Sequence, residues 1–380
     1  MADTFYFSRD TKVVLDDSSG TGYNIPVLDG FSFSQATNTT EVTLNEMATT
    51  AGVSRRARQM FTDSYAPAEW SFSTYIRPFT SGGGGTGGEH AAAHSHVVEE
   101  ALWNALAGNA AIGTTASGNT GPGFVTADAN GADLTFAKSN NVALDTFDLF
   151  FEMGSGKTSP TIYKIADCVV NEVSIDFDID GIATANWSGF GQIITEATAL
   201  PTIDISEGTA AADTNNFIRN RLTDLAVTAT AAGGSEGIVG TYSLTLTGGN
   251  VTIGNNISFL TPETLGIVNQ PLGHVTGTRN VSGSFTCYLN TPASGASSAD
   301  LFEDIIESTS VITNDFNLVF VVGGTGNTPR ITMTLPTCHL EVPTHSIDDI
   351  VSLETTFHAL PTSVDGTDEI TMEFVGPAVT

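Results

Sequence analysis

The feature of this 380-residue sequence that most constrains its fold is an internal repeat. Residues 148–156 (DLFFEMGSG) precede Cys168 in the same way that residues 317–324 (NLVFVVGG) precede Cys338. The two cysteines lie 170 positions apart. A chain that contains one unit twice is expected to fold as two similar domains.

Two further matches extend the repeat. At the cysteine offset, Trp187 aligns with Phe357. Upstream, residues 71–76 (SFSTYI) match residues 284–289 (SFTCYL) at an offset of 213. Both hexamers alternate between two kinds of side chain, as strands with one buried face do.

Each copy also contains a stretch with apolar residues at helical spacing, from which we expect helices over residues 90–107 and 298–308. The offset between the copies falls to 199 at these stretches, from Leu102 to Leu301. The first copy therefore carries insertions, at about 81–95 and 108–142. We expect both insertions in surface loops, where added residues are tolerated.

Composition and repeat together predict a mainly β fold of two tandem β-sandwich or barrel domains, each with one flanking α-helix. Glycine contributes 39 residues, and charged residues make up only 14% of the chain. Such a composition is typical of strands and turns. Leu200-Pro201 and the polar run at 208–216 break the periodicity. We therefore expect a first domain over 1–200, which includes both insertions, and a second domain over 201–380.

The charge balance narrows the possible partners. The chain has 42 acidic and 13 basic residues and a formal net charge of −29. Tight binding of nucleic acid needs clustered Lys and Arg, so a role in binding the phosphates of nucleic acid is disfavoured. No stretch of about 18 apolar residues or signal-like leader is present, so we expect no membrane partner.

Motifs that resemble catalytic or ligand sites fail in their context. Residues 154–158 (GSGKT) resemble the end of a phosphate-binding loop, but Phe151 stands where that loop needs glycine. His94 and His96 have a spacing that puts them on different faces of a helix. The three cysteines form no zinc-binding pair, and we interpret them as buried thiols. The sequence thus predicts no enzyme, no catalytic residue, no cofactor and no metal.

A cluster of cations is the strongest local charge feature. Arg55, Arg56 and Arg58 are three of the 13 basic residues in an acidic chain. We predict that they contact carboxylates of a neighbouring copy, because arginine binds carboxylates in a fixed bidentate geometry. The alternative is a loop whose arginines are solvated or paired within the chain.

Several segments together resemble the tail tube protein of tailed bacteriophages, in a form with two tube domains fused in one chain. The resemblance rests on residues 25–35 (IPVLDGFSFSQ), the arginine-rich loop, residues 67–78 (PAEWSFSTYIRP), a helix in mid-domain, and closing strands near 180–190 and 349–359. It covers nearly all of both halves.

This resemblance implies a structural subunit of the virion tail, assembled in the host cytoplasm. Tail-tube-like domains join side by side into rings that stack into a hollow tube for DNA ejection. Three fused chains would form a trimeric, pseudo-hexameric ring. The implied partners are other copies of the chain, the passing DNA without sequence-specific binding, and other tail proteins: a sheath if the tail is contractile, a terminator, and a baseplate or tip.

An acidic channel follows from the resemblance together with the charge. Asp176, Asp178 and Asp180 alternate at the end of a predicted strand, without the spacing of a calcium loop. Our hypothesis is that some of these three residues, together with Asp348 and Asp349, lie near the lumen, where they repel DNA. The alternative function is a β-sandwich virion decoration protein or a carbohydrate-binding adhesin, either of which predicts discrete particles.

Overall fold

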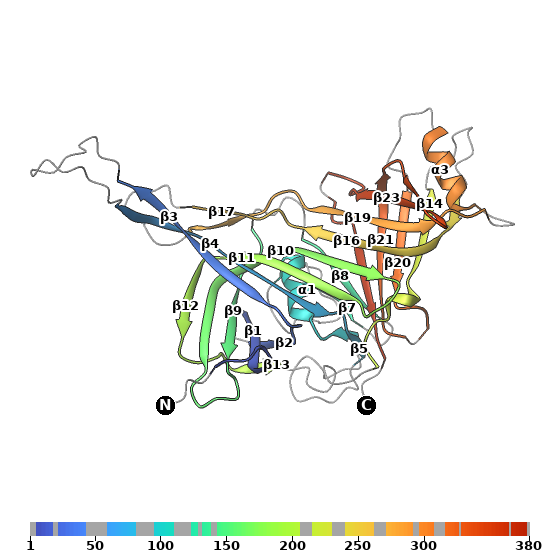
Figure 1. The fold of residues 1–380 in the computed structure, drawn as a ribbon. Helices are drawn as coiled ribbons and strands as arrows, with labels where there is room; N and C mark the ends of the chain where they lie inside the picture. The colour runs from blue at the N-terminus through green and yellow to red at the C-terminus, as the bar shows by residue number, and fades with distance from the viewer. Residues whose placement is uncertain are drawn as a thin grey trace, which may run out of the picture.

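The computed structural model shows a mainly β protein (Figure 1). It describes residues 5–17, 22–42, 59–80, 95–109, 123–127, 131–137, 143–205, 215–229, 240–261, 271–291, 296–307, 316–326, 328–364 and 366–377. Within these residues the α-helices are α1 (Glu100–Ala107) and α3 (Ser298–Glu307). The mainly β prediction with one helix in each half is confirmed.

The prediction of a helix from residue 90 was wrong in its start. Residues Ser95–Val97 form the short strand β6, which pairs with β5 (Pro78–Thr80). Glu99 directly precedes α1, and its side chain accepts hydrogen bonds from Arg77 instead of capping the helix. Residues 81–94 lie outside the described residues.

The strands of the first half pair in a defined order, and we call β1–β12 with α1 the first unit. The ladder runs β2–β1–β9–β10; β10 also pairs with β12 along its first half and with β11 along its second half, and the order continues β11–β4–β3. The bounds are β1 Thr11–Asp17, β2 Gly22–Ile25, β3 Ser32–Glu41, β4 Met60–Tyr75, β9 Phe147–Met153, β10 Thr161–Asp178, β11 Thr184–Gly191 and β12 Ile193–Ala197.

The second half repeats this order, and we call β14–β24 with α3 the second unit. The ladder runs β15–β14–β20–β21, and β21 pairs with both β24 and β23. β22 pairs with β23 beyond the end of β21, and the order β23–β19–β16 completes the sheet. The bounds are β14 Asp224–Ala229, β15 Thr241–Ser243, β16 Thr245–Gly254, β19 Asn280–Tyr288, β20 Phe316–Val322, β21 Arg330–Leu340, β22 Thr344–Ile347, β23 Val351–Ala359 and β24 Thr371–Val375. Short strands outside this scheme are β13 (Ile203–Ile205), β17 (Ser258–Leu260) and β18 (Gly273–Val275).

The ladder register corrects the alignment of Trp187 with Phe357. Phe72 pairs with Trp187, whereas its counterpart Phe285 pairs with Thr355. The structural counterpart of Trp187 is therefore Thr355, at an offset of 168. The reason is the turn before the last strand: Asp176 pairs with Thr184, but Ser346 pairs with Ser352, so the second turn is two residues shorter.

One ring in each unit lies over a glycine, but the ring comes from opposite strands. In the first unit Trp70 pairs with Gly189, where an added Cβ would lie 2.3 Å from the Trp70 Cζ2 atom. In the second unit Gly283 takes the place of Trp70, and Phe357 packs over it. The large and small residues have changed strands, so the packed volume is conserved while the sequence match is lost.

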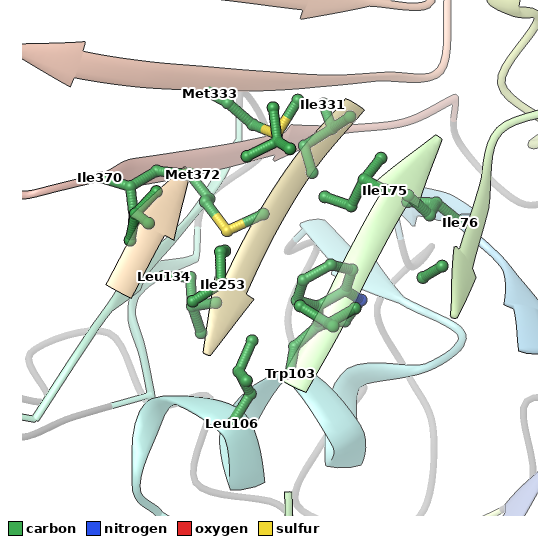
Figure 2. Packing of buried hydrophobic residues seen from close by; sticks show 14 of the residues in the cluster. Ile76, Trp103, Leu106, Leu134, Ile175, Ile253, Ile331, Met333, Ile370 and Met372 are labelled. Carbon is green, nitrogen blue, oxygen red and sulfur yellow. The ribbon is translucent and has the colours of Figure 1, made fainter. Parts of the chain in front are cut away.

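The two units share one sheet and one core. The second half of β10 pairs with β16 over seven residue pairs, from Glu172 with Gly254 to Asp178 with Gly248. The strand order β3-β4-β11-β10-β16-β19-β23-β22 is therefore continuous. Figure 2 shows Trp103 and Ile175 of the first unit close to Ile253 and Ile331 of the second, in one buried cluster.

We had expected the insertion at 108–142 to be a surface loop, but its described part is not. It forms a hairpin of β7 (Gly123–Ala127) and β8 (Ala132–Thr135), and β8 pairs with β24 of the second unit. Phe124 and Leu134 are buried. Apolar side chains in the insertion thus fasten the first unit to the second.

An ion pair reinforces this attachment. Arg279 and Glu369 of the second unit are bonded at 2.5 Å with side chains only 6% and 4% exposed. Arg279 also donates to the backbone oxygen of Ala137 and lies over the ring of Phe136, both in the insertion. Its guanidinium therefore connects three separate segments.

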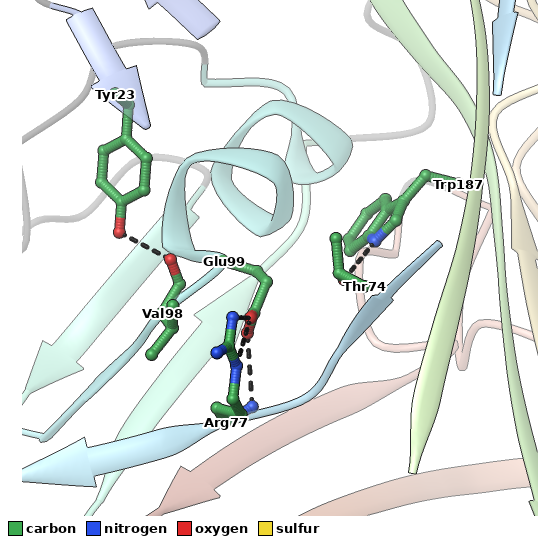
Figure 3. Close-up of polar contacts among 6 residues, drawn as sticks. All are labelled: Tyr23, Thr74, Arg77, Val98, Glu99 and Trp187. Carbon is green, nitrogen blue, oxygen red and sulfur yellow. Dashed lines mark hydrogen bonds and ion pairs between the residues drawn. The ribbon is translucent and has the colours of Figure 1, made fainter. Parts of the chain in front are cut away.

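A second buried pair positions α1 (Figure 3). Arg77, which follows β4, donates to Glu99 through its backbone and side-chain nitrogens, the shortest distance being 2.7 Å. Burial raises the pKa of Glu99 to about 7, although Arg77 opposes this shift. The Tyr23 hydroxyl of β2 donates to the Val98 oxygen, which ties the segment before α1 to the sheet, and the Trp187 indole of β11 donates to the Thr74 hydroxyl of β4.

We predict that Arg279→Met lowers the free energy of unfolding by about 3–5 kcal/mol, because it leaves the Glu369 carboxylate buried without its cation. Urea denaturation measures the change. The matched control is Arg221→Met, which removes an exposed arginine paired with an exposed carboxylate, Asp180, and should cost less than about 1 kcal/mol. Equal losses for the two variants would contradict this account of the attachment.

We also predict that Gly283→Ala lowers the free energy of unfolding by about 1–3 kcal/mol or more, because the added methyl group overpacks the core. A Cβ at this position would lie 2.1 Å from the Asn250 oxygen and 2.7 Å from the Phe357 ring. Gly240→Ala is the control, since nothing lies within 4 Å of its Cβ position, and we expect a change within about 0.5 kcal/mol. Thermal or urea unfolding of both variants distinguishes the two sites.

Candidate functional site

One face of the continuous sheet is polar along its whole width. Alternate residues of each strand point away from the core, as the pleat dictates, and on this face they are rich in hydroxyl and amide groups. Short contacts link neighbouring strands: the Ser73 hydroxyl donates to Asn186 at 2.6 Å, and the Asn186 amide donates to Asp176 at 2.7 Å. Other members are Ser71, Ser174, Ser188, Thr252, Ser282, Ser284 and Thr356. We call this surface the polar face.

The charges on the polar face have one sign. Its carboxylates are Glu69, Glu172, Asp176, Asp178 and Glu354. Among the described residues of β3, β4, β11, β16, β19, β22 and β23, and of the part of β10 that pairs with β16, no lysine or arginine occurs. A surface with only negative charges repels a phosphate backbone over roughly the 8–10 Å that salt leaves unscreened.

The five aspartates predicted near a lumen fall into two groups. Asp176 and Asp178 lie on the polar face. Asp180 lies in the turn after β10 and pairs with Arg221 at 3.1 Å, and Asp348 and Asp349 lie exposed in the turn between β22 and β23. The structure therefore brings the first two together and sets the other three at turns.

Sequence reasoning missed Glu69, Glu172 and Glu354. Glu354 is the lone carboxylate of β23, whereas β4 and β10 each contain further acidic residues beside Glu69 and Glu172. The available signal was their parity, since each is separated by an even number of positions from other outward-facing residues of its strand. That signal becomes decisive only when the strand order is known.

Arg55, Arg56 and Arg58 lie outside the described residues, so their role at a subunit contact stays a prediction. They belong to the sequence between β3 and β4. These two strands form a long hairpin that projects from the rest of the first unit (Figure 1). Met60 and Phe61 at its outer end are exposed.

The continuous sheet ends in two unlike edges, β3 and β22. Among the described residues, β3 pairs only with β4, and β22 pairs only with β23. All four residues of β22 are exposed, and Ile347 is 81% exposed. An uncovered strand edge offers backbone donors and acceptors to another strand.

The three cysteines, all within the described residues, do not form a reactive site. Cys168, Cys287 and Cys338 are free and buried, and burial raises the pKa of all three thiols, to about 11 for Cys287 and about 12 for Cys338. These groups are therefore poor nucleophiles. None of the helices that the structure describes has the length and apolar character to span a bilayer.

Comparisons with known proteins agree with a structural role in a virion. A family described as "Phage tail tube protein" matches residues 62–374. The tail tube protein pb6 of Escherichia phage T5 is 30% identical over 376 residues, which cover 95% of this chain and 74% of pb6. Because the match spans both units and the sheet that joins them, this chain belongs to the phage tail tube protein family and is a component of the virion tail.

Proposed function

We propose that three copies of this protein close into a ring of six units and that stacked rings form a conduit for DNA. The pairing of β10 with β16 carries the proposal, since it is a unit-to-unit junction within one chain. The repeated strand order supports two duplicated domains, with a boundary near residue 200. A structural role without catalysis fits this assembly, as does contact with other tail proteins at the ends of the tube.

The junction between copies follows from the strand equivalence. β22 takes the place of the second half of β10, and β3 takes the place of β16. Pairing of Ser174 with Thr252 and of Asp176 with Asn250 in the chain then predicts Thr344 opposite Ser34 and Ser346 opposite Ser32 between copies. Both edges are exposed and available for such pairing.

A contact of this kind is head-to-tail. Because the two edges differ, each copy leaves the complementary edge for the next, and the chain of contacts closes when the rotation per unit divides a circle. Six units per ring is the number that the family resemblance implies. Three chains would supply them with alternating covalent and non-covalent junctions.

The polar face is our candidate for the channel wall. It is continuous across the junction within the chain, and the same strand pairing would continue it across the junction between copies. Asp176 and Asp178, with the three glutamates of the face, would repel DNA and keep it from adhering. Basic walls have the opposite effect, because each phosphate contact adds affinity.

We predict that Ser34→Asp combined with Thr344→Asp raises the protein concentration needed for assembly several-fold, because two carboxylates would face each other at every junction between copies. Sedimentation velocity and negative-stain microscopy measure assembly. Ser34→Lys combined with Thr344→Asp is the matched variant with opposite charges and should assemble like the wild type. If both double variants assembled equally well, these two positions would not be opposed. Discrete wild-type particles without rings would favour the decoration or adhesin alternative.

We predict that Asp178→Lys combined with Glu354→Lys makes assembled tubes retain duplex DNA at low salt and release it as salt rises. Co-sedimentation with DNA at several salt concentrations measures retention. The control, Glu196→Lys combined with Glu303→Lys, makes the same change in net charge at exposed positions off the polar face. Equal retention by both variants would place the wall elsewhere.

A further inference from the structure

A short segment precedes the first strand of each unit, and the two segments correspond residue by residue. Phe151 and Phe320 occupy the same position of the repeat. Val13 pairs with Phe151 and Leu225 pairs with Phe320, so β1 and β14 correspond at an offset of 212. The offset carries the 3-10 turn η1 (Ser8–Asp10) onto η2 (Asn220–Leu222).

Side-chain surroundings support this correspondence. A Cβ added to Gly154 would meet the ring of Tyr6, and one added to Gly323 would meet Ile218, the counterpart of Tyr6. Phe5 corresponds to Phe217. The equivalent pairs also include Arg9 with Arg221 and Thr11 with Thr223, which keep the same residue type.

The second segment docks on the turn that ends the junction strand of the first unit. Ala183 donates its backbone N–H to the Ile218 oxygen at 3.0 Å, and Asn220 donates to the Gly181 oxygen at 3.2 Å. Ile182 and Arg219 form an antiparallel β-bridge. This turn and this segment therefore join the units beside the pairing of β10 with β16.

Side chains complete the contact. The ring of Phe217 lies 5.2 Å from the ring of Tyr75 and beneath the Arg77 guanidinium at 5.6 Å. Arg221 pairs with Asp180 at 3.1 Å. Ile218, in the same segment, is 0% exposed and belongs to the shared core.

The first segment has the same layout but is uncovered. Phe5 is 73% exposed and Tyr6 is 47% exposed. Its own unit nevertheless holds it in place. Lys157 donates a hydrogen bond to the Phe5 oxygen at 2.7 Å, and the Tyr6 and Thr161 hydroxyls are hydrogen-bonded to each other at 3.0 Å. An ordered, exposed aromatic segment is suited to binding because little conformational freedom remains to be lost.

The second unit presents the matching turn. Ile76 donates to the Ala183 oxygen in the first unit, and Leu289 donates to the Val351 oxygen in the second, which makes residues 348–351 the counterpart of 180–183. Asp348 then corresponds to Asp180, Ile350 to Ile182 and Tyr288 to Tyr75. Ile350 is 59% exposed.

We propose that residues 5–10 of one copy dock on the turn at 348–351 of the next copy. Phe5 packs against Tyr288 of the next copy, and Arg9 pairs with its Asp348, as Phe217 and Arg221 do within the chain. The apolar contact supplies most of the affinity, whereas the exposed ion pair sets orientation. This inference rests on the proposed ring and assigns Asp348 to the junction between copies.

Disulfide trapping tests the contact. Phe7 and Ile350 are the counterparts of the bridged pair Arg219 and Ile182, whose Cα atoms lie at a spacing that a disulfide can span. We expect Phe7→Cys combined with Ile350→Cys to give covalent dimers and trimers on oxidation of assembled protein, seen on non-reducing gels. The native cysteines are buried and do not interfere.

Phe7→Cys combined with Val364→Cys is the control, because Val364 is exposed but outside the turn. It should give no such ladder. If microscopy showed rings of the Phe7 and Ile350 variant but oxidation gave no cross-links, the docking would be overturned and the ring proposal would stand. If the wild type formed no rings or tubes at all, the proposed function itself would fail, and the docking with it.

A second pair of variants separates affinity from folding. Phe5→Ala should raise the concentration needed for assembly about tenfold, as expected for an aromatic anchor. Phe7→Ala should assemble like the wild type, because its counterpart Arg219 is exposed at the junction within the chain. Circular dichroism controls for folding. Identical assembly of the two variants and the wild type would remove the anchor role of Phe5.

Discussion

The backbone pairing of β10 with β16 is the interaction on which the rest of the structure depends. Seven residue pairs make two units into one sheet, so the core beneath them is also shared. Because the sheet is continuous, its two ends are strands of different units, β3 and β22. A subunit with unlike ends assembles head-to-tail, and this geometry suits a protein of the tail tube family.

Local pattern was enough to predict the strand-rich fold and the repeat. Cys168 and Cys338 align because each lies at the same position of its strand, where its Sγ donates to the oxygen three residues earlier. The register near Trp187 was not predictable, since the ring over glycine changed strands and the turn lost two residues. Pairing of β8 with β24 was also invisible, because long-range strand partners leave no local signal.

The candidate site was predictable only in part, for a related reason. Asp176 and Asp178 stand out because two acids alternate in one strand. Glu69 and Glu354 join them only through the order of strands across both units. The likeness of residues 5–11 to 217–223 retains three identical residues in seven, and only the register of β1 and β14 makes it meaningful.

The two kinds of junction in the proposed ring differ in strength for a reason that the chain itself supplies. Within the chain, β8 and Arg279 reinforce the junction, using an insertion between α1 and β9. The chain has 39 residues between α1 and β9 but only 8 between α3 and β20, so the second unit lacks the length of that insertion. Junctions between copies would then rest on the strand edges and the docked segment. Such a ring yields first at alternate junctions, and the covalent pairs of units would survive as its building blocks.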